Sequence, residues 1–228
     1  MEDYEKEVVD LISTKSKLKR DVFELSKERF AELKSELKNL IHTWSVEIVK
    51  VDERLEMRYE DLGPYFAQVT IAGDTLVFSL HTNVFCFPTE NPLWDTSYLK
   101  ANPDRGYCGI IKVYNFLADS IRFNRDKDLG YLVARLFVNS ENHFFVEGKK
   151  ELGLLFNDFM HAELSAEQSR SFLVAVIRHC LKFDLYVPNY NQVARISVGD
   201  ANTLRDSISL RTGKRLGFQF GMEEDPPE

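Results

Sequence analysis

The sequence of 228 residues lacks a long apolar run. Its longest unbroken one, FLVAVI at 172–177, is far shorter than the roughly 20 residues that a helix needs to cross a bilayer. The first ten residues, MEDYEKEVVD, are acidic, whereas a secretion signal begins basic and continues apolar. We therefore expect neither a membrane-spanning helix nor a secretion signal.

Cysteine is scarce as well. The sequence has three cysteines, which are widely spaced and form no C-x-x-C pair: Cys86, Cys108 and Cys180. This spacing excludes the disulfide framework of a small secreted protein and favours a reducing compartment, so we expect a cytoplasmic protein. Cys108 lies between a long loop and an expected helix start, where a helix N-terminus would lower the pKa of its thiol; the alternative is a small buried side chain.

Recognisable catalytic and cofactor motifs are also missing. The sequence has no G-x-S-x-G, and Gly213-Lys214 lacks both the earlier glycine and the following Ser or Thr of a phosphate-binding loop. His81 and Cys86 are five residues apart, which would place them on opposite faces of a strand. We therefore expect no cofactor and no metal site, and we interpret the basic residues near the C-terminus as a solvated strand edge (Arg205, Arg211, Lys214 and Arg215).

The composition that remains is that of a globular protein. Apolar residues make up 44% of the chain and charged residues 29%, which excludes global disorder. The formal net charge is −7, and an acidic chain is repelled by polyphosphate. Nucleic acid is therefore an unfavoured partner.

The first 44 residues contain no glycine and no proline and are rich in Glu, Lys and Leu, which predicts a long helix. Its apolar residues recur at the spacing of a straight amphipathic helix, with a possible break at 13–17. Two interpretations stay open, a helix that covers its own domain and a helix that binds a second copy or another protein. The apolar positions are Val8, Leu11, Ile12, Leu18, Val22, Leu25, Phe30, Leu33, Leu37, Leu40, Ile41 and Trp44.

Residues 45–221 contain both helical and strand patterns, which predicts a single α+β domain. Residues 65–87 predict two strands joined at 72–74, 109–124 predict a helix, and 128–156 predict strands that turn at 139–142 and at 148. A capping box at Ser165 and Gln168 opens a buried helix. We expect an α+β fold in which the N-terminal helix and two further helices pack on a mainly antiparallel, hairpin-built sheet, followed by a strand, a short helix, a hairpin and an acidic disordered tail at 222–228.

The stretch Glu147-Gly148-Lys149 ends an apolar run, and Asp128 lies upstream of it. At these three residues the chain resembles nucleases of the Asp…Glu-x-Lys superfamily. The resemblance implies a divalent metal held between Asp128 and Glu147, with Lys149 positioning or activating water. Gly148 instead favours a turn, and a similar string recurs at 212–220, so we interpret the stretch as a hairpin.

The segment 88–107 holds three prolines and no helical or strand period. Loops of this length are often functional. Trp94, Tyr98, Arg105 and Tyr107 within it are of the types enriched at binding hot spots. The segment is interpreted as a lid over a pocket, as a contact arm, or as a loop held against its own domain by its aromatic residues.

The leading functional hypothesis is a non-catalytic intracellular binding or scaffold protein. Its contact surfaces would be the N-terminal helix and the 88–107 loop, and its partner would be another protein or a second copy of the chain. A metal-dependent phosphodiesterase or nuclease at Asp128, Glu147 and Lys149 is the first alternative. A small-molecule-sensing domain with a pocket under the 88–107 loop is the second.

Overall fold

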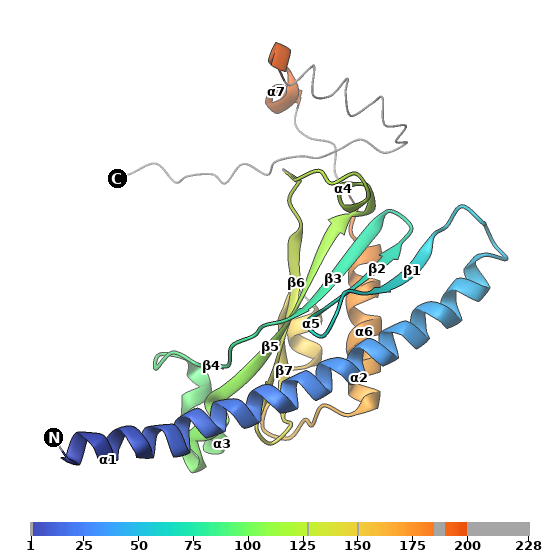
Figure 1. The fold of residues 1–228 in the computed structure, drawn as a ribbon. Helices are drawn as coiled ribbons and strands as arrows, with labels where there is room; N and C mark the ends of the chain where they lie inside the picture. The colour runs from blue at the N-terminus through green and yellow to red at the C-terminus, as the bar shows by residue number, and fades with distance from the viewer. Residues whose placement is uncertain (1, 127, 150, 185–189, 200–228) are drawn as a thin grey trace.

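The computed structural model of the chain describes residues 2–126, 128–149, 151–184 and 190–199. Within these residues the fold is α+β, as the sequence predicts: a long N-terminal helix crosses an antiparallel sheet of seven strands, and shorter helices surround the sheet (Figure 1). The acidic tail at 222–228 and the basic residues Arg205, Arg211, Lys214 and Arg215 lie outside the described residues, as does the hairpin expected before the tail.

The N-terminal helix is continuous from Glu2 to Ile48. It consists of α1 (Glu2–Leu11), a π-helical turn (Ile12–Ser16) and α2 (Lys17–Ile48). The break expected at 13–17 is therefore a widened turn, in which the hydroxyls of Ser13 and Thr14 both donate hydrogen bonds to the Asp10 carbonyl (3.1 and 2.6 Å). The helix passes the expected boundary at Trp44 by four residues.

The sheet has the order β1-β2-β3-β5-β6-β7, and the short β4 pairs with the first two residues of β5. All described pairs are antiparallel. The strands are β1 (Met57–Asp61), β2 (Phe66–Ile71), β3 (Asp74–Leu80), β4 (Phe85–Cys86), β5 (Tyr107–Leu117), β6 (Tyr131–Asn139) and β7 (Phe144–Gly148). The shorter helical elements are η2 (Pro92–Asp95), α3 (Ser97–Ala101), η3 (Pro103–Gly106), α4 (Ala118–Arg122), α5 (Glu151–Leu155), α6 (Ala166–Leu181) and α7 (Tyr190–Val193).

The main core lies where α2 and α6 pack on the sheet. Phe30, Leu33 and Leu37 of α2 are fully buried there, together with Phe172 and Leu173 of α6. The expected cap of α6 is confirmed, because the Ser165 hydroxyl accepts a hydrogen bond from the Gln168 amide (3.2 Å). The hairpin expected within 65–87 is also confirmed as the β2–β3 pair, and Ala72 adopts the positive φ (52°) that its tight turn requires.

The prediction of a helix at 109–124 is wrong. Residues 107–117 form the central strand β5, and only 118–122 are helical. Ile110 and Ile111 are both buried although they point to opposite faces of the sheet. A strand that is covered on both faces loses the alternation of apolar and polar residues by which strands are recognised, so its apolar positions matched a helical period by chance.

The prediction of a hairpin at 143–156 is correct for its first strand and wrong for its second. Residues 144–148 form β7, but the chain then enters α5 and not a second strand. Gly148 is needed for close packing there, since a Cβ at this position would lie 2.8 Å from the Cβ of Leu152 in α5. The similarity between 147–156 and 212–220 therefore does not mark a shared strand-turn-strand unit.

Candidate functional site

The 88–107 segment folds into three short helical turns, η2, α3 and η3, on the sheet face opposite the main core. Ile110 of β5, Phe137 of β6 and Phe145 of β7 form this face, while their neighbours along each strand point into the main core. Asn91, Thr96 and Asn102 each cap one of the turns through a side-chain oxygen, which explains how a segment without any sequence period is ordered.

The space beneath the segment is filled by a second hydrophobic cluster. Leu99 is fully buried in it, and the rings of Phe137 and Phe145 stack 4.7 Å apart with planes 4° from parallel. Phe159 meets Phe145 edge-on at 5.0 Å. Aromatic rings thus occupy the place in which the sequence suggested a ligand pocket.

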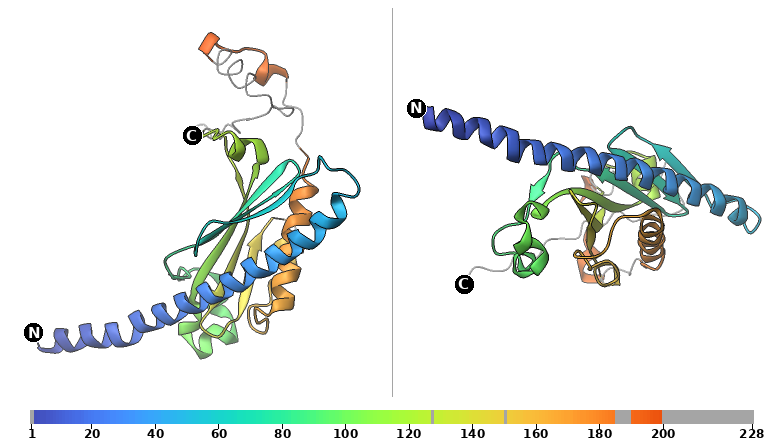
Figure 2. Two further views of the ribbon diagram at one scale, coloured as in Figure 1. Left: turned by 45° about the vertical axis from the view of Figure 1, so that its right-hand side comes forward. Right: turned by 90° about the horizontal axis from the view of Figure 1, so that it is seen from below.

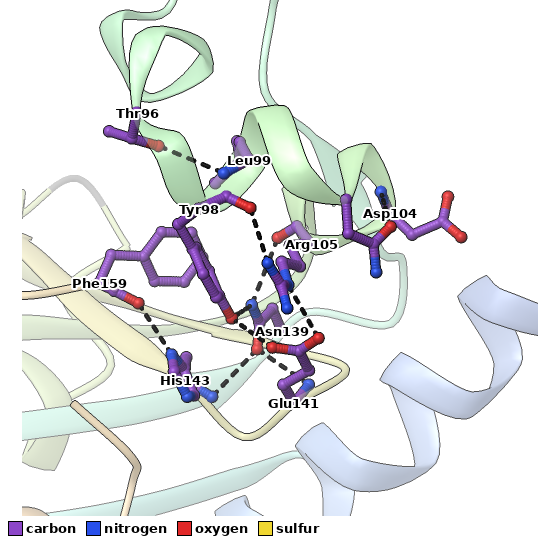
Figure 3. Close-up of polar contacts among 10 residues, drawn as sticks. Thr96, Tyr98, Leu99, Asp104, Arg105, Asn139, Glu141, His143 and Phe159 are labelled. Atoms are coloured by element: carbon purple, nitrogen blue, oxygen red, sulfur yellow. Dashed lines mark hydrogen bonds and ion pairs between the residues drawn. The ribbon is translucent and has the colours of Figure 1, made fainter. Parts of the chain in front are cut away.

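A polar network fastens the segment to the turn between β6 and β7 (Figure 3). Tyr98 donates a hydrogen bond from its hydroxyl to Glu141 (2.9 Å) and accepts one from the Asn139 amide (2.9 Å). Arg105 donates from Nε to Glu141 (2.8 Å) and from Nη1 to the Tyr98 carbonyl (2.9 Å). The Tyr98 ring lies between Arg105, 4.3 Å from its centroid, and the stacked imidazole of His143, 5.0 Å away.

This network shifts the pKa values of its members. Burial raises the pKa of Tyr98 to about 12. Burial alone would also raise the pKa of Glu141, but the hydrogen bonds from Arg105 and Tyr98 outweigh it and hold that pKa below its ordinary value. At neutral pH, therefore, a phenol meets a carboxylate, which is an arrangement that holds a loop in place.

Of the four residues that the sequence suggested for binding, the structure brings three together. Trp94 packs on the second hydrophobic cluster, as Tyr98 does, and its indole N–H donates to the Pro88 carbonyl (2.9 Å). Tyr107 lies apart, on the α2 side of the sheet, where Lys19 approaches its ring to 5.8 Å. The sequence did not predict the roles of Asn139 and Glu141. Residues in a turn follow no repeating apolar pattern, so nothing in the sequence indicates which distant residue they contact.

The structure does not bring Asp128, Glu147 and Lys149 together. Asp128 precedes β6 and accepts a hydrogen bond from the Ser120 hydroxyl (2.6 Å) beside α4. Glu147 forms an ion pair with Arg135 across the β6–β7 ladder. Seven residues of mostly extended chain separate Asp128 from Arg135, which is on the order of 20 Å. Within the described residues, no group of three His, Cys, Asp or Glu side chains could hold a metal ion.

The environment expected for Cys108 is also corrected. Cys108 is fully buried within β5, away from any helix start, and burial raises the pKa of its thiol. The exposed cysteine is Cys86 in β4, whose pKa is raised by partial burial although Lys15 and Lys19 oppose the shift. Neither thiol has the environment of an activated nucleophile.

The first third of the N-terminal helix carries apolar side chains that no described residue covers. Tyr4, Val8, Leu11 and Ile12 are 73%, 54%, 48% and 61% exposed. Tyr4, Val8 and Leu11 are four and three residues apart, so they form one apolar stripe on α1. Figure 2 shows this end of the helix projecting beyond the sheet, and Val22 is the first residue of the helix that is buried among those described.

The π-helical turn sets the direction of this stripe. A π turn holds one residue more than an α turn and therefore rotates the two parts of the helix relative to each other by about 100°. Without it, Tyr4, Val8 and Leu11 would continue the buried stripe of α2, to which Val22 belongs. With it, the exposed α1 stripe lies on a different side of the helix from the buried stripe of α2.

In the described residues, no helix is both long and apolar enough to cross a membrane. Comparisons with protein-family models, with curated proteins and with solved structures find no match to this chain.

Proposed function

We propose that this protein is a non-catalytic binding or scaffold protein and that α1 with the π-helical turn is its contact element. One observation carries the proposal: a single helix buries most of its large apolar residues from Val22 to Ile41, whereas those from Tyr4 to Ile12 are left exposed by the described residues. Single exposed apolar residues are common on protein surfaces, but a stripe of them on a projecting helix is typical of a helix that docks with another.

The helix suits this role physically. An isolated helix of 15 residues is marginal in water, because forming the first turn is costly. Here α2 is held by the core and provides that first turn, so α1 only extends an existing helix. The contact element is thereby ordered before it meets a partner, which reduces the entropy lost on binding.

The 88–107 segment has a different part in this proposal. The side chains of Tyr98 and Arg105 are engaged within the protein, and so is the indole N–H of Trp94. The segment lies beside the start of α2, since Asp104 and Tyr107 border the same shallow hollow as Lys17 and Leu18 of the helix.

Site-specific photo-cross-linking in the cells that make the protein tests this function. A photo-reactive amino acid would replace Val8 on the stripe or, as the matched control, Lys6, which is exposed on the opposite side of the same helix. We expect discrete covalent adducts from position 8 and at least about fivefold fewer from position 6. Equal yields at the two positions, or no adduct at position 8, would overturn the proposal.

A further inference from the structure

The charges along the projecting helix are divided into two blocks. Between residues 3 and 10 there are four carboxylates and one lysine, and between residues 15 and 20 there are four basic residues and no acid. When two identical helices pair in parallel, blocks of the same charge face each other and repel. When they pair antiparallel, the acidic block of each helix faces the basic block of the other and attracts it. The blocks are Asp3, Glu5, Glu7 and Asp10, and Lys15, Lys17, Lys19 and Arg20.

The helix dipole does not explain this division. Carboxylates at a helix N-terminus are favoured by the dipole, but the effect falls off within the first turn, whereas Glu7 and Asp10 lie beyond it. The basic block lies in the middle of a helix that runs to Ile48, where the dipole favours no charge. Within the described residues, Asp3, Glu5 and Glu7 form no ion pair.

From these features we infer that the occupant of the α1 stripe is a second copy of this chain, paired antiparallel over residues 3–19 and centred on Leu11. The inference rests on the proposed function and adds the identity of the partner. In this register Leu11 meets Leu11 across a two-fold axis. Three oppositely charged pairs flank the stripe on each half of the dimer, namely Asp3 with Lys19, Glu5 with Lys17 and Glu7 with Lys15.

The helix geometry places the charges on matching sides. Glu5 and Lys17 are twelve residues apart, of which the π turn absorbs one, and eleven residues are three turns to within about 20°. They therefore lie on the same side of the stripe, and a two-fold axis brings that side of both helices together. Lys17 now forms an exposed ion pair with Asp21 (2.9 Å), which is weak enough to exchange.

The body of the protein sets the limit of the pairing. Val22 is the first buried residue of α2, and just before it one side of the helix already faces the body, where Lys19 approaches the Tyr107 ring to 5.8 Å. A register centred on Leu11 ends at Lys19, before the first buried residue. The paired length is about 26 Å, at 1.5 Å per residue. An interface this short belongs to the weak and transient class, and the dimer therefore depends on concentration.

Charge exchange in the full chain, followed by light scattering, tests the inference. In the antiparallel dimer, residues 5 and 7 of one copy face residues 17 and 15 of the other. The variant Glu5→Lys/Glu7→Lys therefore brings basic residues against basic residues, and Lys15→Glu/Lys17→Glu brings acidic residues against acidic residues. We expect each double variant to dimerise at least about tenfold more weakly than the natural chain. Combining all four substitutions exchanges the blocks and should restore the dimer, which a parallel pairing would not allow.

Circular dichroism controls for loss of helix, because lysine near the N-terminus opposes the dipole. The cysteine variant Leu11→Cys, made in a Cys86→Ser background, should form an interchain disulfide. Tyr4→Cys should not, since its copies would lie about 20 Å apart in the antiparallel register. The remaining cysteines, Cys108 and Cys180, are buried.

The outcomes separate the two proposals. If the natural chain stays monomeric up to a few hundred micromolar, a second copy does not bind the α1 stripe and the inference is wrong. The inference is also wrong if the natural chain dimerises and the double variants dimerise equally well. Efficient cross-linking of Tyr4→Cys to itself overturns the antiparallel register. Photo-adducts from position 8 that contain only a different protein would retain the proposed function and reject the inference; adducts of twice the chain mass support both.

Discussion

Two side chains from distant parts of the sequence hold the 88–107 segment in place. Arg105 comes from η3 and Glu141 from the turn after β6, and their ion pair is shielded by the Tyr98 ring. Half-buried hydrogen bonds between charged groups contribute more than pairs on an open surface, although Glu141 keeps about a third of its exposure (36%). The segment is therefore a fixed part of the domain.

We expect Glu141→Gln to lower the free energy of unfolding at pH 7 by about 1 kcal/mol. Because the pKa of Glu141 in the folded state lies below its ordinary value of 4.5, its contribution is present above that pH and is lost as the pH falls through the folded-state pKa. The difference between the two proteins should shrink on acidification. Urea unfolding at pH 7 and pH 3 measures it.

The exposed carboxylate Glu53, on the turn after α2, gives the matched control. Glu53→Gln should leave the unfolding free energy within about 0.5 kcal/mol at both pH values. A loss for Glu141→Gln that is the same at pH 3 as at pH 7 would contradict the role given to the charge.

A second contact at the residue scale is the approach of α2 to β5. A Cβ at Gly109 would lie 2.0 Å from the Ser26 hydroxyl oxygen and 2.6 Å from the Ser26 Cβ. We expect Gly109→Ala to destabilise the protein by about 2 kcal/mol, because neither the strand nor the buried helix can move aside. Adding Ser26→Gly removes both clashing atoms and should recover part of the loss, despite a cost of about 1 kcal/mol to the helix. Thermal unfolding of the natural chain, the two single variants and the double variant measures this coupling. If the two substitutions change the free energy of unfolding additively, Gly109 and Ser26 are not in contact.

At the scale of elements, the N-terminal helix has two parts of different character. From Val22 to Ile41 it forms the main core with α6 and the sheet, and before that it has no buried residue among those described. The π-helical turn separates the two parts and rotates the apolar stripe of α1 to the side. π turns within α-helices are frequent at functional sites, which fits a contact element here.

Two identical substitutions distinguish the two parts. Leu37 of α2 is fully buried, so we expect Leu37→Ala to lower the free energy of unfolding by about 2–5 kcal/mol. Leu11→Ala should change it by less than about 0.5 kcal/mol at concentrations where the chain is monomeric, because Leu11 is half exposed and Ala is a strong helix former. Denaturant unfolding measures both. A large loss from Leu11→Ala would mean that α1 is covered by its own chain.

At the scale of the whole molecule, the helix is at once a structural part of the domain and an arm that leaves it. Seven residues of α2 are buried, among them Phe30, Leu33 and Leu37. They cover the sheet face that carries Val69, Val113 and Leu136. The boundary expected near residue 44 therefore does not divide this core, which is made from both sides of it.

Truncation at two positions tests this division. A chain that starts at Lys17 keeps every buried residue of α2 and should remain folded and monomeric. A chain that starts at Ser45 loses all of them and should aggregate, since a large apolar sheet face becomes exposed. Light scattering after gel filtration, together with thermal unfolding, measures both; a soluble, cooperatively folded chain from Ser45 would contradict the shared core.

The sequence by itself determined the elements whose apolar residues follow one unambiguous period or whose ends carry a capping or turn signal. These are the N-terminal helix, the 66–80 hairpin and α6 with its cap at Ser165. It also determined the α+β class, because helical and strand periods occur in the same chain. In each case the signal lies within a few residues of the structure that it specifies.

The tertiary structure alone decided the features that depend on what lies across space. β5 is a strand because both of its faces are covered, and the 88–107 segment is fixed because Asn139 and Glu141 come within hydrogen-bonding distance of it. Likewise, the apolar stripe at Tyr4, Val8 and Leu11 has the same period as the buried one, and it is exposed because no described part of the body lies against that part of the helix. Burial is a property of the assembled chain, and a local period cannot encode which partner, if any, will cover it.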